Sequence, residues 1–191
     1  DSKFGTAIET GQALEMVGYA ASLQNIDLKG LHCHVGSQVF GEDIFERASE
    51  VMLAFMKQCN DTFDIQLEHL DMGGGYGVRY TDADPTVDIS ASIHKVAAHI
   101  RGLCEQKGLP MPNVIMEPGR SIVADAGMTL YSVGTVKVIP GYKNYVSIDG
   151  GMTDNPRYAL YESEYTVIAA DKAEENCNFL CDLVGKCCES G

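Results

Sequence analysis

The sequence has no tryptophan, few basic residues and no apolar run long enough to cross a bilayer. Lys and Arg together number 14 against 27 Asp and Glu, so the formal net charge is −13. A protein that binds nucleic acid needs a basic face to neutralise phosphates, and an anionic membrane surface makes the same demand. The composition therefore argues against a nucleic-acid partner and against a membrane partner.

The chain also lacks an initiator Met, a signal-peptide apolar region and a regular pattern of paired cysteines. Its seven cysteines are odd in number and lie mostly within apolar stretches, unlike those of a secreted disulfide scaffold. We therefore expect reduced thiols and a cytoplasmic location. The 191 residues suffice for one core and the start of a second, and the first residues suggest a fragment or a processed form.

Apolar residues at helical spacing predict helices over residues 10–24, 43–59 and 88–108. Thr10 is expected to cap the first helix at its N-terminus, and Gly108 is expected to end the third. The expected buried stripes comprise Leu14, Val17 and Ala21; Ile44, Ala48, Val51 and Phe55; and Ile89, Ile93, Val96, Ile100 and Leu103.

Apolar runs between these helices are typical of buried strands, and each ends in a turn that contains glycine. The alternation predicts the α/β class, with a parallel sheet covered by helices. After about Ala126 the pattern changes to strand-like runs with no convincing helix between them. We expect one domain over residues 1–127 and the start of a β-rich domain over residues 128–191. Over the whole chain, the runs expected to form strands and the turns that follow them cover residues 26–38, 63–77, 112–120, 128–139, 142–151, 163–172 and 176–188.

The loops after the first two strands carry polar and glycine residues, and ligands of parallel α/β folds bind at the carboxyl ends of strands. Gly73, Gly74 and Gly75 allow backbone N–H groups to converge on an anion, although glycines in a turn often serve the turn alone. His32 and His34 share one face of an extended strand and could bind a metal. His34 could instead lie flat against a planar ring, or be a satisfied core histidine.

The loop after the third strand combines Glu117 and Arg120 around the tight turn Pro118–Gly119, which directs both side chains to one mouth. An Arg in this place suits a phosphate or a carboxylate, and a surface ion pair is the alternative. Ser37 could donate to a phosphate or cap a turn. An anion cradle, a planar partner, a buried acid and an Arg are together what pyridoxal phosphate requires.

Five stretches in order, "GLHCHVGSQ", "LDMGGGYG", "EPGRSIVADAG", "SIDGGMTDNPRYALYES" and "CCESG", resemble the diaminopimelate decarboxylase family. The resemblance implies part of a (β/α)8 TIM-type barrel of the alanine-racemase kind, followed by part of a C-terminal β domain. It implies pyridoxal 5'-phosphate as cofactor, and decarboxylation of meso-2,6-diaminopimelate to L-lysine, the last step of lysine biosynthesis. It also implies a homodimer with shared active sites.

The resemblance also assigns roles to individual residues. His34 would stack on the cofactor ring, and Glu117 would pair with the pyridine nitrogen. Cys188 would protonate the carbon that has lost CO2, and Glu189 would bind the distal amino group of the substrate in the partner subunit's site. The residues around the phosphate would be Ser37, Gly73, Gly74, Gly75, Gly119 and Arg120, and those holding the substrate's carboxylates would be Arg120, Arg157 and Tyr161. No metal ligand is implied.

Several alternatives remain open at the level of sequence. Cys188 could be a buried strand thiol, and a zinc site at Cys177, Cys181, Cys187 and Cys188 would lack paired knuckles. The substrate could be arginine, ornithine or carboxynorspermidine. The chain could also be a non-catalytic homologue that binds pyridoxal phosphate, or less readily a racemase. The Schiff-base lysine is expected upstream of this chain, so we expect an internal fragment that is inactive and poorly folded alone.

Overall fold

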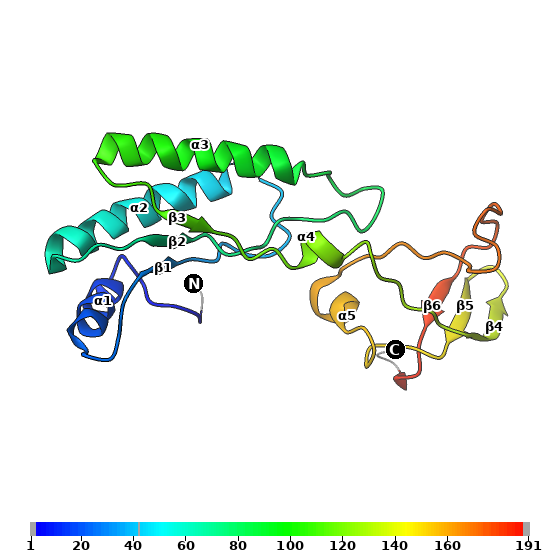
Figure 1. Cartoon of the computed structure of the whole chain (residues 1–191). Helices are drawn as coiled ribbons and strands as arrows, with labels where there is room; N and C mark the ends of the chain where they lie inside the picture. The colour runs from blue at the N-terminus through cyan, green and yellow to red at the C-terminus, as the bar shows by residue number, and fades with distance from the viewer. Residues whose placement is uncertain (1–2, 42, 189–191) are drawn as a thin grey trace. The chain divides into compact units, whose positions relative to one another are not determined.

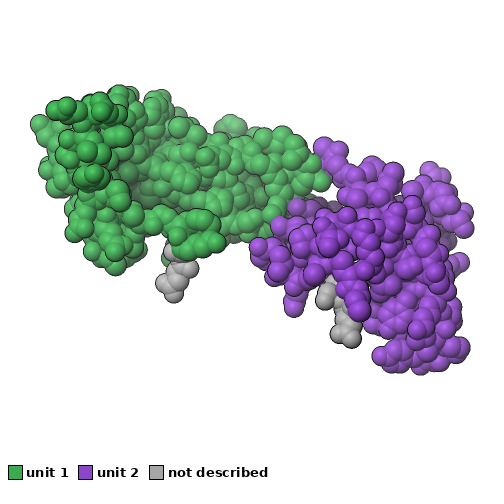
Figure 2. Space-filling view, turned by 90° about the horizontal axis from the view of Figure 1, so that it is seen from below, with its two compact units in different colours: residues 1–78, 85–124 green, residues 79–84, 125–191 purple. Residues whose placement is uncertain are grey.

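The computed structural model of the protein describes residues 3–41 and 43–188, and the chain divides into two compact units. Unit 1 comprises residues 1–78 and 85–124, and unit 2 comprises residues 79–84 and 125–191 (Figure 2). No helix within the described ranges is long and apolar enough to cross a membrane. The domain boundary after residue 127 stays a prediction, because a compact unit is not by itself an independently folding domain.

Unit 1 is a small parallel sheet whose strands alternate with helices, as the sequence predicts. The strands are paired in the order β1-β2-β3, and both pairs are parallel. Figure 1 shows α2 and α3 side by side along the sheet. The elements are α1 (Gln12–Ser22), β1 (Gly30–His32), α2 (Ile44–Phe63), β2 (His69–Asp71), α3 (Ile89–Lys107), β3 (Asn113–Ile115) and the short α4 (Arg120–Val123).

The core of unit 1 lies between the helices and one face of the sheet. Strand register places Leu31, Leu70 and Val114 opposite one another, and all three pack into this core. Leu70 and Met72 are fully buried. Because successive strand residues point to opposite faces, the alternate residues of each strand lie on the face away from the helices. That second face carries His32, Asp71 and Ile115.

The helix ends are partly as predicted. Gly108 ends α3 in the left-handed conformation, and the side chain of Asp88 caps its start by accepting the N–H of Ala91. Thr10 was expected to cap α1, and this is wrong. Gly11 occupies the cap position with φ of 83°, while the Thr10 hydroxyl donates to the carbonyl of Ala7. The left-handed turn at Gly11 shifts the helix start beyond the reach of Thr10.

The predicted helices are present, and the predicted buried stripe of α2 holds for Phe55 and for the partly buried Ala48 but is wrong for Ile44 and Val51. Val51 is 51% exposed, and Ile44 is also exposed. The helix instead directs the side that carries Phe45 toward the core. The Phe45 ring stacks on Tyr76 with 4.4 Å between ring centroids. The predicted stripes of the other helices hold for Val17, Val96 and Ile100 but not for Ala21 or Ile93, which are exposed. The buried residues of α2 are Phe45, Ser49, Met52, Leu53, Phe55, Met56 and Cys59.

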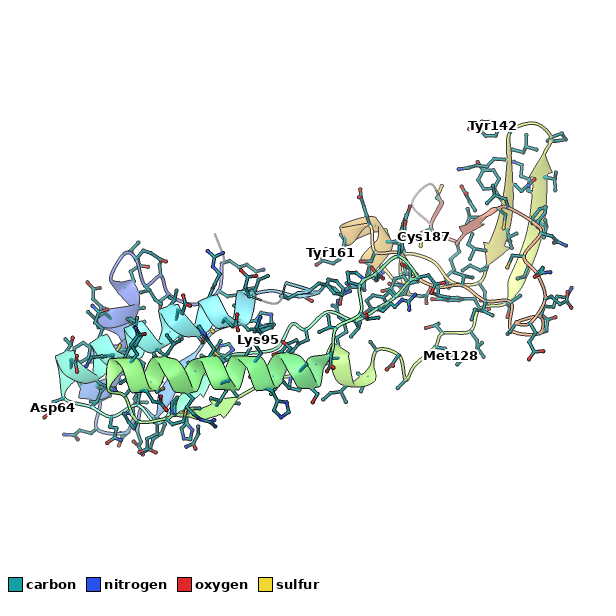
Figure 3. All side chains as sticks on the ribbon, turned by 90° about the horizontal axis from the view of Figure 1, so that it is seen from above. Asp64, Lys95, Met128, Tyr142, Tyr161 and Cys187 are labelled. Carbon is teal, nitrogen blue, oxygen red and sulfur yellow. The ribbon has the colours of Figure 1, made fainter. Side chains whose placement is uncertain are left out.

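Unit 2 is built on a hairpin, β4 (Val133–Ile139) and β5 (Lys143–Ile148), with Tyr142 at its turn (Figure 3). β6 (Asp182–Val184) pairs in parallel with β5. The β-rich character is therefore as predicted, although the expected strand over 176–188 is confined to β6. The short helix α5 (Arg157–Tyr161) was not expected; it begins after Pro156, where the Arg157 N–H donates to the Asn155 side chain.

The predicted strand over residues 163–172 is wrong, since the structure assigns no strand there. The Thr166 hydroxyl donates to the carbonyl of Tyr80, and the ring of Tyr165 packs against the ring of Tyr80 at 5.2 Å between centroids. The segment is thus held by side-chain contacts to residues 79–84 of the same unit rather than by a strand ladder.

Three glycines allow the loops after β1, β2 and β3 to pack backbone against backbone. A Cβ on Gly73 would lie 2.6 Å from the carbonyl oxygen of Cys33, and one on Gly74 would lie 2.2 Å from that of Glu117. A Cβ on Gly75 would lie 2.0 Å from the carbonyl oxygen of Gly36. Real Cβ atoms do not approach backbone oxygens so closely, because van der Waals repulsion prevents it. Any side chain at these positions would therefore force the loops apart.

Leu53→Ala should destabilise the protein by between about 2 and 5 kcal/mol, because Leu53 is fully buried in the core and its loss leaves a cavity. Val51→Ala on the same helix is the matched control, and we expect a change within about 0.5 kcal/mol because half of this side chain is exposed. Thermal denaturation followed by circular dichroism measures both. Equal shifts for the two variants would contradict the burial of α2 described here.

Gly74→Ala should cost about 1–3 kcal/mol through overpacking against the Glu117 carbonyl. Gly102→Ala is the control, because a Cβ at this exposed position of α3 would meet nothing within 4 Å. In a helix that control change should stabilise by about 0.5–1 kcal/mol. The same melting experiment separates them, and a neutral Gly74→Ala would show that the loops are not in close backbone contact.

Candidate functional site

A pocket of about 250 Å³ lies in unit 1, where the loops after β1, β2 and β3 meet. Most of the residues singled out from the sequence of unit 1 take part in it; Gly73 does not line it. The pocket is thus made at the carboxyl ends of parallel strands, as expected for this class of fold. Its lining residues are His34, Ser37, Gly74, Gly75, Tyr76, Glu117, Gly119, Arg120 and Ser121.

Backbone hydrogen bonds tie the middle loop to both neighbours. The Cys33 N–H donates to the Asp71 carbonyl at 2.9 Å, and the Glu117 N–H donates to the Gly73 carbonyl at 2.8 Å. The Val39 N–H donates to the Gly75 carbonyl at 2.9 Å. These bonds continue the pairing of the short strands beyond their ends, so the pocket lining is held by the sheet itself.

Two backbone amides of the glycine loop are directed at side chains of the protein itself, whereas the sequence allowed such amides to converge on an anion or to serve the turn alone. The Gly73 N–H donates to Oδ1 of Asp71 at 2.8 Å, and the Gly74 N–H is directed at Nδ1 of His34 at 3.4 Å. Since Nδ1 is the acceptor, a neutral His34 ring carries its proton on Nε2. Asp71 therefore holds the loop in place, and the binding of a cofactor by Gly73 stays a prediction.

Glu117 was expected to be a buried acid, and this is wrong for the chain described here. Its side chain is 56% exposed and lies 3.4 Å from His32, measured between Oε2 and Nε2. Strand alternation places Glu117, two residues beyond Ile115, on the sheet face away from the helices. The side-chain ligand atoms of His32, Asp71 and Glu117 all lie within 4.8 Å of one another. The metal pair considered from sequence, His32 with His34, is not this group.

Two pocket residues were missed from the sequence, Tyr76 and Ser121. Tyr76 is 4% exposed and stacks on Phe45, so it links the pocket floor to the core. Burial raises the pKa of its hydroxyl, which stays protonated at neutral pH. Tyr76 directly follows the glycines and Ser121 directly follows Arg120. This position next to predicted site residues was the one signal in the sequence that could have identified them.

Cys33 stands behind the pocket and is not a candidate nucleophile. Burial and, to a smaller extent, the nearby Asp71 carboxylate together raise the pKa of its thiol to about 11. A thiol attacks as the thiolate, so Cys33 is inert at neutral pH.

The other predicted site residues belong to unit 2. Arg157 and Tyr161 lie on α5, one turn apart, with the guanidinium carbon 5.3 Å from the centre of the Tyr161 ring. Cys188 is exposed and follows β6, with φ of 52°, so the reading as a buried strand thiol is wrong. Its neighbour Cys187, labelled in Figure 3, is directed toward the Thr153 hydroxyl at 3.8 Å. Glu189 lies outside the described residues.

Cys188 also borders a shallow hollow of about 560 Å³ on the sheet of unit 2. This hollow includes Lys137 and Tyr145. The roles predicted for Cys188, Arg157 and Tyr161 in substrate binding and proton transfer stay predictions.

The donor set of the unit 1 pocket fits a planar, phosphate-bearing cofactor. Ser37 offers a hydroxyl, Arg120 offers a guanidinium and the three lining glycines offer backbone close to the ligand. His34 presents a flat ring, and Glu117 presents a carboxylate. The ring, the phosphate and the basic nitrogen of such a cofactor would each meet a chemically suited group within this one pocket.

Comparison with known proteins agrees with this chemistry. Residues 1–124 match the family model described as "Pyridoxal-dependent decarboxylase, pyridoxal binding domain". Over its whole length the chain is 40% identical to diaminopimelate decarboxylase of Staphylococcus aureus (strain COL) and 38% identical to that of Bacillus subtilis (strain 168). It spans 44% of the length of each of these relatives.

The fold agrees as well. The chain superposes on the crystal structure of diaminopimelate decarboxylase from M. jannaschii in complex with L-lysine with a TM-score of 0.87 and 30% identity, covering 100% of this chain and 42% of that one. The predicted fold class, part of the pyridoxal-binding barrel followed by part of a C-terminal sheet, is confirmed. The chain belongs to the pyridoxal-dependent decarboxylase family.

Proposed function

We propose that the parent protein, meaning the longer protein of which this chain is a part, decarboxylates meso-2,6-diaminopimelate to L-lysine and CO2 with pyridoxal 5'-phosphate as cofactor. One observation carries the proposal. Three loops far apart in sequence bring the polar groups suited to that cofactor into a single pocket of about 250 Å³. Similarity to diaminopimelate decarboxylases along the whole chain supports the choice of substrate.

Residues of unit 1 would hold the cofactor. Ser37, the backbone of Gly74 and Gly75, and Gly119 with Arg120 would surround the phosphate, as their place in the pocket supports. His34 would lie against the ring, and Glu117 would hold the proton of the pyridine nitrogen. When bound, pyridoxal phosphate supplies an electron sink for the electron pair of the broken carbon–carbon bond.

Residues of unit 2 would bind the substrate and move the proton. Arg157 and Tyr161 would bind carboxylates of diaminopimelate together with Arg120, because a guanidinium pairs with a carboxylate through two parallel hydrogen bonds. Loss of CO2 leaves a carbon that must gain one proton. Sγ of Cys188 would deliver it, which suits an exposed thiol. Glu189 would accept a hydrogen bond from the distal ammonium group.

The proposal includes a homodimer in the cytoplasm, with Cys188 and Glu189 of each subunit completing the site of the other. The parent protein would act in lysine biosynthesis. The isolated 191-residue chain would be inactive, since its three-stranded parallel sheet leaves two edges unpaired among the described residues.

The parent protein should form lysine and CO2 from meso-diaminopimelate only when pyridoxal phosphate is present. Cys188→Ala should lower kcat by about 10²–10⁴-fold, the range of a lost proton donor. Release of CO2 and chromatographic detection of lysine measure this. Cys177→Ala is the matched control, because Cys177 is also an exposed thiol of unit 2 and should be replaceable without loss.

Arginine, ornithine and carboxynorspermidine are the competing substrates in that assay. Turnover of one of them in place of diaminopimelate would keep the cofactor and overturn the substrate. Cofactor binding without turnover of any of the four would favour the non-catalytic homologue. Absence of cofactor binding would overturn the proposal as a whole.

Arg157→Gln should raise the KM for diaminopimelate by about 10–100-fold, because a hydrogen bond to a charged group contributes about 1.5–3 kcal/mol. Pyridoxal phosphate affinity should not change, since Arg157 is assigned to substrate alone. Arg101→Gln on the exposed face of α3 is the control. Steady-state kinetics with equilibrium dialysis of the cofactor separate the two effects, and a loss of cofactor affinity in Arg157→Gln would show that the assignment is wrong.

A further inference from the structure

The imidazole of His32 lies 3.4 Å from the carboxylate of Glu117, yet it has no role in the reaction proposed above and does not line the pocket. It is the last residue of β1, and strand register places it directly opposite Asp71, the last residue of β2. Glu117 follows β3 on the same face of the sheet. Three adjacent strands thus deliver one imidazole and two carboxylates to one place.

The distances within this group define how it is connected. Nε2 of His32 lies 3.4 Å from Oε2 of Glu117, and the ligand atoms of all three residues lie within 4.8 Å of one another. Asp71 also makes a hydrogen bond outside this group, since its Oδ1 accepts the N–H of Gly73 at 2.8 Å. Asp71 therefore holds the glycine loop of the pocket, and His32 contacts Glu117, whose carboxylate belongs to the pocket.

A metal ion is one occupant that a nitrogen and two carboxylates could bind. His32 and Glu117 are both more than half exposed, and exposed acidic groups often lie together without an ion. A metal on Glu117 would also occupy the oxygens that a cofactor nitrogen needs. The 3.4 Å contact between His32 and Glu117 is better explained as a direct polar interaction between the two side chains.

We propose that His32 is a positioning residue that orients the carboxylate of Glu117 for the pyridoxal cofactor. The inference rests on the proposed function, because it assigns a task to Glu117 that only a bound cofactor requires. Nε2 of His32, 3.4 Å from Oε2 of Glu117, holds that carboxylate oxygen on the side of His32. The other carboxylate oxygen is then left for a ligand in the pocket.

The physical need for such a residue follows from the exposure of Glu117. An exposed glutamate samples many rotamers, and fixing one of them on ligand binding costs conformational entropy. A polar contact already made in the free protein removes part of that cost, so the ligand binds more tightly. Glu117 lies two residues beyond the end of β3, and its backbone is already fixed by the bond from its N–H to the Gly73 carbonyl, so His32 restrains the remaining side-chain freedom.

The test uses the parent protein and measures the dissociation constant of pyridoxal phosphate by equilibrium dialysis. His32→Leu should weaken cofactor binding by about tenfold, the scale expected for one lost polar contact to a charged group. His32→Gln keeps an N–H donor and should recover most of the affinity. The KM for diaminopimelate should change little in either variant. His94→Leu, an exposed histidine on α3, is the matched control and should bind the cofactor as the unmodified protein does.

A double-mutant cycle with Glu117→Gln distinguishes positioning from general damage. If His32 acts through Glu117, His32→Leu should have no further effect on cofactor affinity once Glu117 is replaced. Equal losses in both backgrounds would overturn the inference, as would an unchanged dissociation constant in His32→Leu. Melting curves of the cofactor-free variants must coincide with that of the unmodified protein, and a lowered midpoint in His32→Leu that Gln does not restore would assign a purely structural role.

Two further results separate this inference from its alternatives. Loss of cofactor affinity after treatment with a chelator, restored by a divalent cation, would overturn positioning in favour of a metal held by His32, Asp71 and Glu117. Failure of the unmodified parent protein to bind pyridoxal phosphate would instead overturn the proposed function. Binding by the parent protein with no coupling between His32 and Glu117 would overturn this inference alone.

Discussion

The arrangement of unit 1 depends on close contact between the backbones of three loops. Gly73, Gly74 and Gly75 approach the carbonyls of Cys33, Glu117 and Gly36 to distances at which no Cβ fits. Gly73 and Gly75 also have positive φ values of 66° and 100°, which other residues rarely adopt. These glycines allow strand pairing to continue into the loops, and the loops in turn place His34, Ser37 and Arg120 around one pocket.

Because side chains alternate along the three short strands, the residues that pack in the core lie on one face of the sheet and the titratable residues lie on the other. Leu31, Leu70 and Val114 face the helices and the core, whereas their neighbours in sequence face away. The second face carries His32, Asp71 and Glu117, so titratable groups collect where the helices do not cover the sheet. The proposed decarboxylase uses that face, with Glu117 serving the cofactor and His32 and Asp71 holding the surrounding groups.

The parts of the fold that depend on local pattern could be predicted from sequence, and those that depend on packing could not. Asp88 caps the start of α3 and Gly108 ends it, both through local interactions, and the role of Gly108 was predicted from the sequence. The positions of Ile44 and Val51 on α2 were misjudged because Phe45 stacks on Tyr76, a partner distant in sequence. Glu117 was placed correctly in the pocket through its tight turn, yet its exposure and its contact with His32 depend on three-strand register, which no single motif contains.

The central claim is that the pocket of unit 1 binds pyridoxal phosphate with its phosphate at the glycine loop and its pyridine nitrogen at Glu117. A crystal structure of the parent protein soaked with pyridoxal phosphate tests it most directly. The account predicts density for the cofactor in this pocket, with the phosphate against Ser37, Gly74 and Gly75 and the ring nitrogen within hydrogen-bonding distance of the Glu117 carboxylate. Cofactor density elsewhere in the protein, or in this pocket with the ring nitrogen away from Glu117, would contradict it.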